Sequence, residues 1–318
     1  MEKTAFVFPA QGAQYVGMGK ELYDHYEHIR STYDQANEIM EIDIKQISFT
    51  GPKEDLQKTE NTQPCIHAME IGIARQIESF GVVPDMTAGF SLGQYASLVT
   101  AGAFRFEDTL QILRKRGIIV DSHVPRDIGK MMAIIGLEDD DIMDIIKEAS
   151  KVGTLEISDY NCPQEIIVAG LNAAVEYADR LAKEKGARKT VVLPINQPFH
   201  TSILDESAAE LKKEIMKIDI SMPRIPVIEN VYAKVIEAPN EIPGLMELHT
   251  SRSVRWRQCV EKMIELGARV FLELGPSGLV TKFVNRTADA LGIQVETFHI
   301  EDCESMEHFR KYIKESLA

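Results

Sequence analysis

A serine flanked by glycines constrains this chain more than any other feature of the sequence. The run GFSLG at residues 89–93 is the pattern by which α/β enzymes turn sharply from a strand into a helix and expose a serine hydroxyl. Residues 82–88 are typical of a short strand, and the residues after Gly93 are typical of an amphipathic helix. The pattern predicts an α/β fold with Ser91 above a helix N-terminus. A tight turn around an ordinary serine is the alternative interpretation.

The composition limits the class of protein. The chain has 318 residues, of which 44% are hydrophobic and 26% charged, as in a soluble globular protein. No apolar run reaches the roughly 20 residues of a membrane span, so we expect a cytoplasmic protein with no membrane contact. The net charge of −14 argues against binding nucleic acid. The four cysteines lie far apart, which predicts neither disulfides nor a metal site.

The remaining pattern predicts a mostly parallel sheet with an inserted small unit. The expected strands of the large part are 4–8, 82–88, 227–230, 269–274 and 294–300. Its expected helices are 20–30, 62–80, 106–120, 255–266 and 304–316. This order is typical of an α/β-hydrolase-like domain with its nucleophile at the carboxyl end of a strand.

The middle of the chain follows a different order. It predicts strands at 131–135, 155–160, 165–169 and 190–193, with helices at 139–150 and 172–185. This βαββαβ order is the ferredoxin-like arrangement. We therefore predict a large subdomain formed by residues 1–127 and 197–318, with a small subdomain at 128–196.

A nucleophilic serine requires a base, and His200 is the favoured candidate among eight histidines. It follows the small subdomain directly, where the chain re-enters the large part near the expected cleft. Of the others, His25, His28 and His67 lie in predicted helices, His123 follows one, and His299 and His308 lie near the C-terminus.

Several further motifs occur together with the serine. The runs are FPAQGAQ (8–14), GFSLGQ (89–94), KRG (115–117), PFH (198–200), VRW (254–256) and ELGP (273–276). In order and spacing they resemble the malonyl-CoA:acyl carrier protein transacylases, over nearly the whole chain. The inserted ferredoxin-like unit is also what that family carries.

The resemblance implies a role for each matching residue. Ser91 would hold the acyl group as an ester, and His200 would take its proton and later return it to a thiol. The backbone N–H groups of Gln11 and Leu92 would stabilise the oxyanion, an effect of about 3 kcal/mol per donor. Arg116 would bind the free carboxylate of malonate, for which a planar bidentate donor is well suited.

The resemblance also implies residues that shape the substrate pocket. Leu92 and Phe199 match malonyl-type signatures that leave little room for an α-methyl group, a preference worth about 1–3 kcal/mol. Asn161 matches a pocket residue, and His249 stands where a glutamine lies near the catalytic histidine, which it would orient through its main chain. The sequence departs from the family pattern at Ala10, Phe90, Gln94, Gln164, Glu165 and Ser253.

These features predict malonyl transfer from malonyl-CoA to the phosphopantetheine thiol of acyl carrier protein in fatty acid biosynthesis, by a monomer without a bound cofactor. Docking of the acidic carrier protein is expected at a basic patch of Lys183, Lys185, Arg188 and Lys189. The alternatives are a trans-acting polyketide synthase acyltransferase, an acyl carrier protein thioesterase on the same scaffold, and an inactive binding module.

Overall fold

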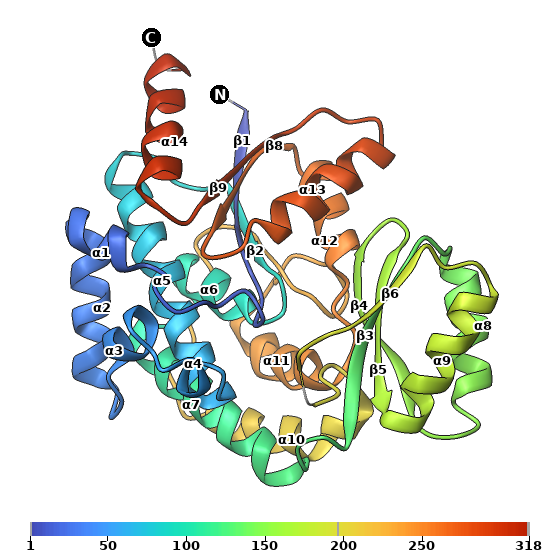
Figure 1. The fold of residues 1–318 in the computed structure, drawn as a ribbon. Coiled ribbons are helices and arrows are strands. Elements are labelled where there is room, and N and C mark those ends of the chain that lie inside the picture. Colours follow the sequence, from blue (N-terminus) through green and yellow to red (C-terminus); the bar gives the residue numbers. More distant parts are fainter. Residues whose placement is uncertain (1, 196, 317–318) are drawn as a thin grey trace.

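The larger part of the molecule is built on a five-stranded sheet. The computed structural model describes residues 2–195 and 197–316, and all statements below concern these residues. Neighbouring strands of this sheet run parallel in the order β7-β2-β1-β8-β9 (Figure 1). They are β1 (Lys3–Phe8), β2 (Met86–Gly89), β7 (Val227–Ile228), β8 (Ala268–Leu274) and β9 (Glu296–Ile300).

Helices cover both faces of this sheet. Alternate side chains of a strand point to opposite faces, so Phe6 and Phe8 of β1 enter one core while Ala5 and Val7 enter the other. The helices of the first core include α2 (Glu27–Ile39), α5 (Thr59–Ser79), α6 (Gly93–Thr100), α7 (Phe106–His123), α10 (Asp205–Ile215) and α11 (Ile242–Ser251). The second core contains α12 (Trp256–Glu265) and α13 (Leu279–Ala290). The first core also receives side chains from α1 (Lys20–His25), α3 (Ile44–Phe49), α4 (Lys53–Leu56) and α14 (Cys303–Ser316).

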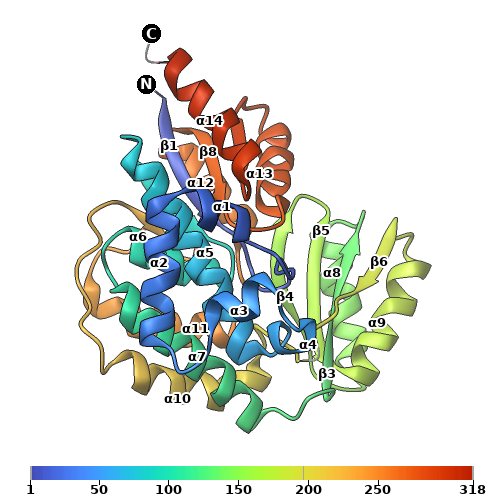
Figure 2. The same cartoon turned by 60° about the vertical axis from the view of Figure 1, so that its left-hand side comes forward.

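A second, antiparallel sheet stands beside the first part, with its two helices on the outer side (Figures 1 and 2). Its strand order is β4-β5-β3-β6. The elements follow one another as β3 (Gly129–Ile135), α8 (Asp139–Ala149), β4 (Leu155–Cys162), β5 (Glu165–Leu171), α9 (Asn172–Glu184) and β6 (Lys189–Val192). The subdomain boundaries at 128 and 196 stay a prediction, and residue 196 lies outside the described residues.

The two faces of the small sheet have different neighbours. One face packs on α8 and α9. The other face presents Met131, Ala133 and Ile167, which share a buried cluster with Val120 of α7 and with Phe199. One apolar face of the small sheet therefore borders the space that contains His200, the predicted base for Ser91.

Some predicted elements were wrong in extent. The helix expected over 20–30 is two helices, because Tyr26 has an extended backbone (φ −120°, ψ 125°). The strand expected at 82–88 begins only at Met86, and Val83 is 66% exposed. Helices α10, α11 and α13 were not predicted. No helix among the described residues is both long and apolar enough to cross a membrane.

Replacing Gly93 with alanine should destabilise the fold. A Cβ at this position would lie 2.4 Å from the backbone oxygen of Phe8, so β1 and α6 must separate. We expect Gly93→Ala to lower the free energy of unfolding by about 2 kcal/mol or more, measured by urea denaturation. Gly244→Ala is the matched control, because nothing lies within 4 Å of its Cβ and its helix should gain about 0.5–1 kcal/mol. Equal stability of the two variants would contradict the close contact.

Candidate active site

Ser91 occupies a sharp turn between β2 and α6. Its φ is 50°, in the left-handed region that residues with a side chain rarely adopt. A Cβ at Gly89 would lie 1.8 Å from the carbonyl carbon of Gly93, so only glycine fits there. The turn therefore has the tight geometry predicted from the sequence, with the serine at the end of a parallel strand.

The side chain of Asn230 forms two hydrogen bonds to the backbone of this turn. The backbone N–H of Ser91 donates to Asn230 Oδ1 at 3.0 Å, and Asn230 Nδ2 donates to the backbone oxygen of Gly89 at 2.9 Å. Asn230 is buried just beyond β7, the strand next to β2. These two bonds hold the strained serine in place, and nothing in the sequence around residue 91 indicates them.

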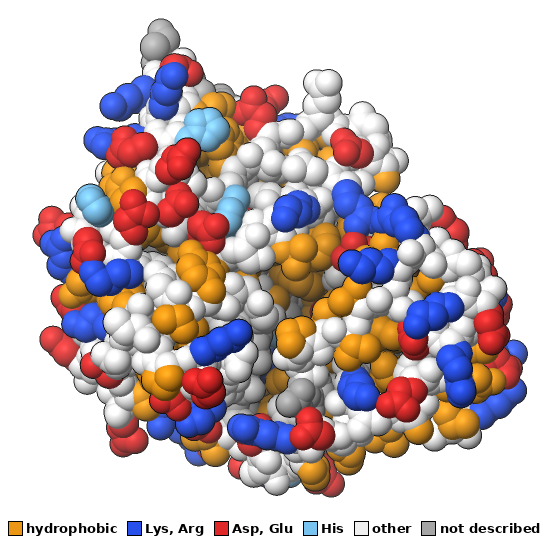
Figure 3. All heavy atoms as spheres, in the orientation of Figure 1, with side chains coloured by type: hydrophobic (Ala, Val, Ile, Leu, Met, Phe, Trp, Pro, Cys, Tyr) orange, Lys and Arg blue, Asp and Glu red, His pale blue; other side chains and the backbone are white. Residues whose placement is uncertain are grey.

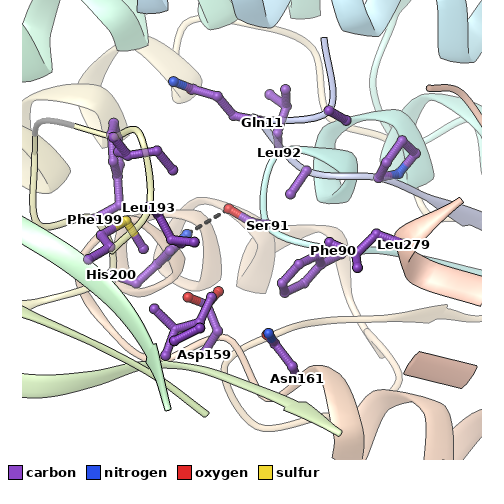
Figure 4. A pocket seen from close by; sticks show the side chains of 18 of the residues that line it. Gln11, Phe90, Ser91, Leu92, Asp159, Asn161, Leu193, Phe199, His200 and Leu279 are labelled. Atoms are coloured by element: carbon purple, nitrogen blue, oxygen red, sulfur yellow. Dashed lines mark hydrogen bonds between the residues drawn. The ribbon is translucent and has the colours of Figure 1, made fainter. Parts of the chain in front are cut away.

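Ser91 and His200 are in direct contact (Figure 4). Ser91 Oγ and His200 Nε2 are 2.6 Å apart, and His200 Nδ1 lies 2.7 Å from the backbone oxygen of His249. A carbonyl oxygen only accepts hydrogen bonds, so Nδ1 carries the proton and the Nε2 lone pair faces the serine hydroxyl. A main-chain carbonyl thus orients the histidine of the pair.

His200 is held in its neutral form. Burial, and to a lesser degree the nearby positive charge of Arg116, lower its pKa to about 3. The two backbone carbonyls near the ring act in the opposite direction but more weakly. At neutral pH the imidazole is therefore free to accept a proton from Ser91.

Arg116 is a buried cation without an anionic partner among the described residues. It is 2% exposed, and its guanidinium carbon lies 5.4 Å from the ring centroid of Phe199 and 6.0 Å from that of Tyr95. Burial lowers its pKa, and its Nε has no hydrogen-bond partner within residues 2–195 and 197–316. An unpaired buried charge is costly, and a carboxylate bound in the adjoining cavity would compensate it.

The backbone around Gln11 and Leu92 can receive an oxyanion. Leu92 precedes the first residue of α6, and Gln11 lies in the turn after β1, so both border the cavity beside Ser91 (Figure 4). No described residue accepts a hydrogen bond from either N–H. Gln63 Nε2 donates to Gln11 Oε1 at 2.9 Å and steadies that turn. The positive φ of this turn, 105°, falls on Gly12. Ala10, where the family usually has a glycine, has no positive φ and so no backbone strain.

These groups share one cavity of about 230 Å³, seen as an apolar hollow in Figure 3. Met131, Ala133 and Ile167 line it from the small sheet. The opposite wall is also largely apolar and consists of Phe90, Leu279, Val280 and Phe283. The residues described contain no group of three or more His, Cys, Asp or Glu side chains that could hold a metal ion.

Most predicted site residues reach this cavity. Its lining includes Ser91, His200, Gln11, Leu92, Arg116, Phe199 and Asn161. His249 does not line it but lies behind His200, with ring centroids 5.3 Å apart. Burial lowers the pKa of His249 well below the usual value, and the nearby His200 and Arg116 act in the same direction.

Sequence reasoning missed Asp159, Glu165 and Leu279 as lining residues. Asp159 and Asn161 are two residues apart on β4, so their side chains share a face of that strand. Glu165 follows the turn that joins β4 to β5. This period-two spacing was the signal that could have placed Asp159 in the pocket.

Comparisons with known proteins show to which family the chain belongs. Residues 5–315 match the acyl transferase domain family. The chain is 35% identical, over 99% of its length and 98% of the relative, to a malonyl CoA-acyl carrier protein transacylase of Bacillus subtilis. The chain belongs to this transacylase family. A crystal structure of the transacylase from Clostridium perfringens is also similar, with a TM-score of 0.94 and 33% identity over 99% of this chain and 98% of the other.

A related structure holds a transacylase together with a carrier protein. It is described as PlMCAT:AntF (holo), a type II PKS acyl-carrier protein in complex with its malonyl-transacylase. The chain is 30% identical to it, with a TM-score of 0.92, over 95% of this chain and 97% of the other.

Two departures from the transacylase pattern have clear local surroundings. Phe90 packs against Trp256 and Phe283, with ring centroids 5.6 and 5.8 Å away, and so extends the apolar wall. Ser253 Oγ donates to the backbone oxygen of Ile157 at 2.5 Å, which ties the segment before α12 to β4. Neither change touches the contact between Ser91 and His200.

Removing the Asn230 side chain should slow the reaction of Ser91 without unfolding the protein. Loss of a buried hydrogen-bond partner costs about 1–3 kcal/mol. If about 1.4 kcal/mol of this cost raises the activation free energy for reaction of Ser91, the reaction slows about tenfold. We expect Asn230→Ala to react about tenfold more slowly with a fluorophosphonate, followed by intact mass. Asn285→Ala is the control, because it loses a side-chain hydrogen bond from Asn285 Nδ2 to Thr297 Oγ1 away from the site. Unchanged labelling of Asn230→Ala would show that the turn holds its shape unaided.

Proposed function

We propose that this protein transfers a malonyl group from malonyl-CoA to the phosphopantetheine thiol of acyl carrier protein, in fatty acid biosynthesis. Membership of the transacylase family supports this reaction. The single observation that carries it is the buried, unpaired Arg116 in the same cavity as the Ser91 and His200 pair. A cavity with a nucleophile and one uncompensated cation suits an acyl group that ends in a carboxylate.

The first half of the reaction acylates the serine. Ser91 Oγ attacks the thioester carbonyl as His200 Nε2 takes its proton, and the N–H groups of Gln11 and Leu92 stabilise the oxyanion. The C–S bond then breaks, and His200 returns the proton to the departing CoA thiolate. The product is a malonyl ester on Ser91 and free CoA.

The second half reverses these roles. His200 accepts the proton of the phosphopantetheine thiol, whose sulfur attacks the ester carbonyl. When the C–O bond breaks, His200 protonates Ser91 Oγ and the malonyl group leaves as a thioester on the carrier protein. The apolar walls around Ser91 would limit water, which protects the ester between the two halves.

The other lining residues would select the acyl group. Arg116 would hold the malonyl carboxylate, while Leu92 and Phe199 would leave little space for an α-branch. Asn161 would contact the substrate from the small sheet, and His249 would act through its backbone oxygen. We expect a monomer in the cytoplasm with no resident cofactor.

Two alternatives share part of this chemistry. A trans-acting polyketide acyltransferase would use the same residues and differ in its carrier protein. The similarity to a malonyl-transacylase in complex with a type II PKS carrier protein supports this second candidate. A thioesterase acting on uncharged chains would have no use for a buried guanidinium such as Arg116, which makes it the weaker alternative.

The acyl-enzyme tests the proposed function directly. Incubated separately with malonyl-CoA and acetyl-CoA, the protein should form a malonyl adduct on Ser91 and little acetyl adduct, seen by intact mass and peptide mapping. Ser91→Ala should lose the adduct and keep its fold. Arg116→Ala should slow malonyl loading about tenfold or more and acetyl loading far less, because only malonyl carries a carboxylate. Steady release of CoA without an adduct would instead favour a hydrolase.

Ion pairs within the predicted docking patch favour fewer docking cations than the four expected from the sequence. Lys183 Nζ lies 2.7 Å from Asp179, and Lys185 Nζ lies 2.9 Å from Asp141, so their charges are largely neutralised. Arg188 and Lys189 are exposed and have no ion-pair partner within the described ranges. They stand at the start of β6, which leads to the cavity-lining Leu193. We therefore propose Arg188 and Lys189 as the docking cations.

Charge-reversal variants distinguish the proposed docking cations Arg188 and Lys189 from the ion-paired lysines. Arg188→Glu and Lys189→Glu should each raise the KM for acyl carrier protein about fivefold to tenfold at low salt, because a long-range attraction becomes a repulsion. Acylation of Ser91 by malonyl-CoA should not change. Lys183→Glu is the control, because its charge is already paired with Asp179. An equal effect of all three variants would remove Arg188 and Lys189 as a specific docking surface.

A further inference from the structure

The cavity contains a buried carboxyl group that the proposed reaction does not use. Asp159 on β4 lines the same cavity as Ser91 and His200 (Figure 4) and is only 3% exposed. Its one hydrogen bond within the described residues comes from the Ser158 hydroxyl, which donates to Oδ2 at 2.5 Å. No lysine or arginine among the described residues lies within ion-pair distance of it.

The second carboxylate of the cavity wall is in a different state. Glu165 Oε2 lies 2.5 Å from Arg286 Nη1, and Arg286 Nη2 donates to the backbone oxygen of Pro163 at 2.7 Å. Asn161 Nδ2 also donates to Glu165 Oε1 at 3.3 Å. The charge of Glu165 is therefore compensated, whereas that of Asp159 is not.

Two arginines of the elements packed against β4 are already paired with other carboxylates. Arg257 of α12 pairs with Asp139 of α8, and Arg286 of α13 pairs with Glu165 of β5. Arg255 lies over the ring of Tyr160, with its guanidinium carbon 5.5 Å from the centroid. The remaining ionisable groups of the cavity are His200 and Arg116.

Burial favours the neutral form of an isolated carboxyl group. Desolvation raises the pKa of Asp159 to about 7, although the Ser158 hydroxyl lowers it. The protonation state of this side chain therefore changes near neutral pH, while that of buried His200, with a pKa of about 3, does not.

We propose that Asp159 is a specificity-determining residue whose charge decides whether an acyl donor with a free carboxylate is accepted in the cavity. This inference rests on the proposed function. A neutral Asp159 leaves Arg116 as the dominant charge and admits a carboxylate. An ionised Asp159 places a second negative charge in the same poorly solvated space and repels it. A donor without a carboxylate, such as acetyl-CoA, is insensitive to this change.

The test compares two donors at several pH values. Initial rates of Ser91 acylation by malonyl-CoA and acetyl-CoA are measured by quenched-flow intact mass, for the wild type and Asp159→Asn. In the wild type the malonyl-to-acetyl ratio should fall about tenfold between about pH 6 and about pH 9. In Asp159→Asn the ratio should stay constant and equal the low-pH value. Taking the ratio cancels any titration that affects both donors alike.

A second variant gives an independent readout. Ser158→Ala keeps the carboxyl group but removes the hydroxyl that stabilises its ionised form. The midpoint of the fall in the ratio should therefore move to higher pH, and this holds even if Asp159→Asn does not fold. A ratio that is flat with pH in the wild type, or that falls equally in Asp159→Asn, would overturn the inference. Failure of both donors to acylate Ser91 in the wild type would overturn the proposed function instead.

Discussion

The close contact between the serine turn and β1 sets the positions of the other site residues. Gly93 lies so near the backbone oxygen of Phe8 that no side chain fits between them. Because β7, β2 and β1 are adjacent and parallel, the segments after them meet at one edge of the sheet. These segments supply Asn230, Ser91 and Gln11, so strand order brings together the proposed nucleophile, the residue that hydrogen-bonds to its turn and one proposed oxyanion donor.

The histidine depends on the small sheet as well as the large one. His200 has a φ of 61°, and the preceding Phe199 is packed among residues of α7 and of the inner face of the small sheet. The backbone oxygen that orients its ring comes from α11 of the large part. A change in the placement of either part would therefore alter the distance between His200 and Ser91, which makes their packing a condition for catalysis.

The sequence indicated the local features of the site and the pairing of Ser91 with His200, but not the other distant contacts. The serine turn, the parallel sheet and the order of elements in the small unit follow from glycine spacing and apolar periodicity, which are local. Asn230 is 139 residues from Ser91, and no pattern links them. A sequence motif placed Arg116 on a helix, but only the fold buries it. The raised pKa of Asp159 likewise comes from burial, a property of three-dimensional packing.

In the proposed function, the charge of Arg116 would connect substrate recognition to the basicity of His200. This charge is one of the causes that lower the pKa of the imidazole. A carboxylate that pairs with Arg116 cancels much of that effect, so His200 becomes a stronger base when a carboxylated donor is bound. A donor without a carboxylate leaves the guanidinium uncompensated and the base weak. One buried arginine can therefore favour the malonyl group twice, through its binding and through the proton transfer that follows.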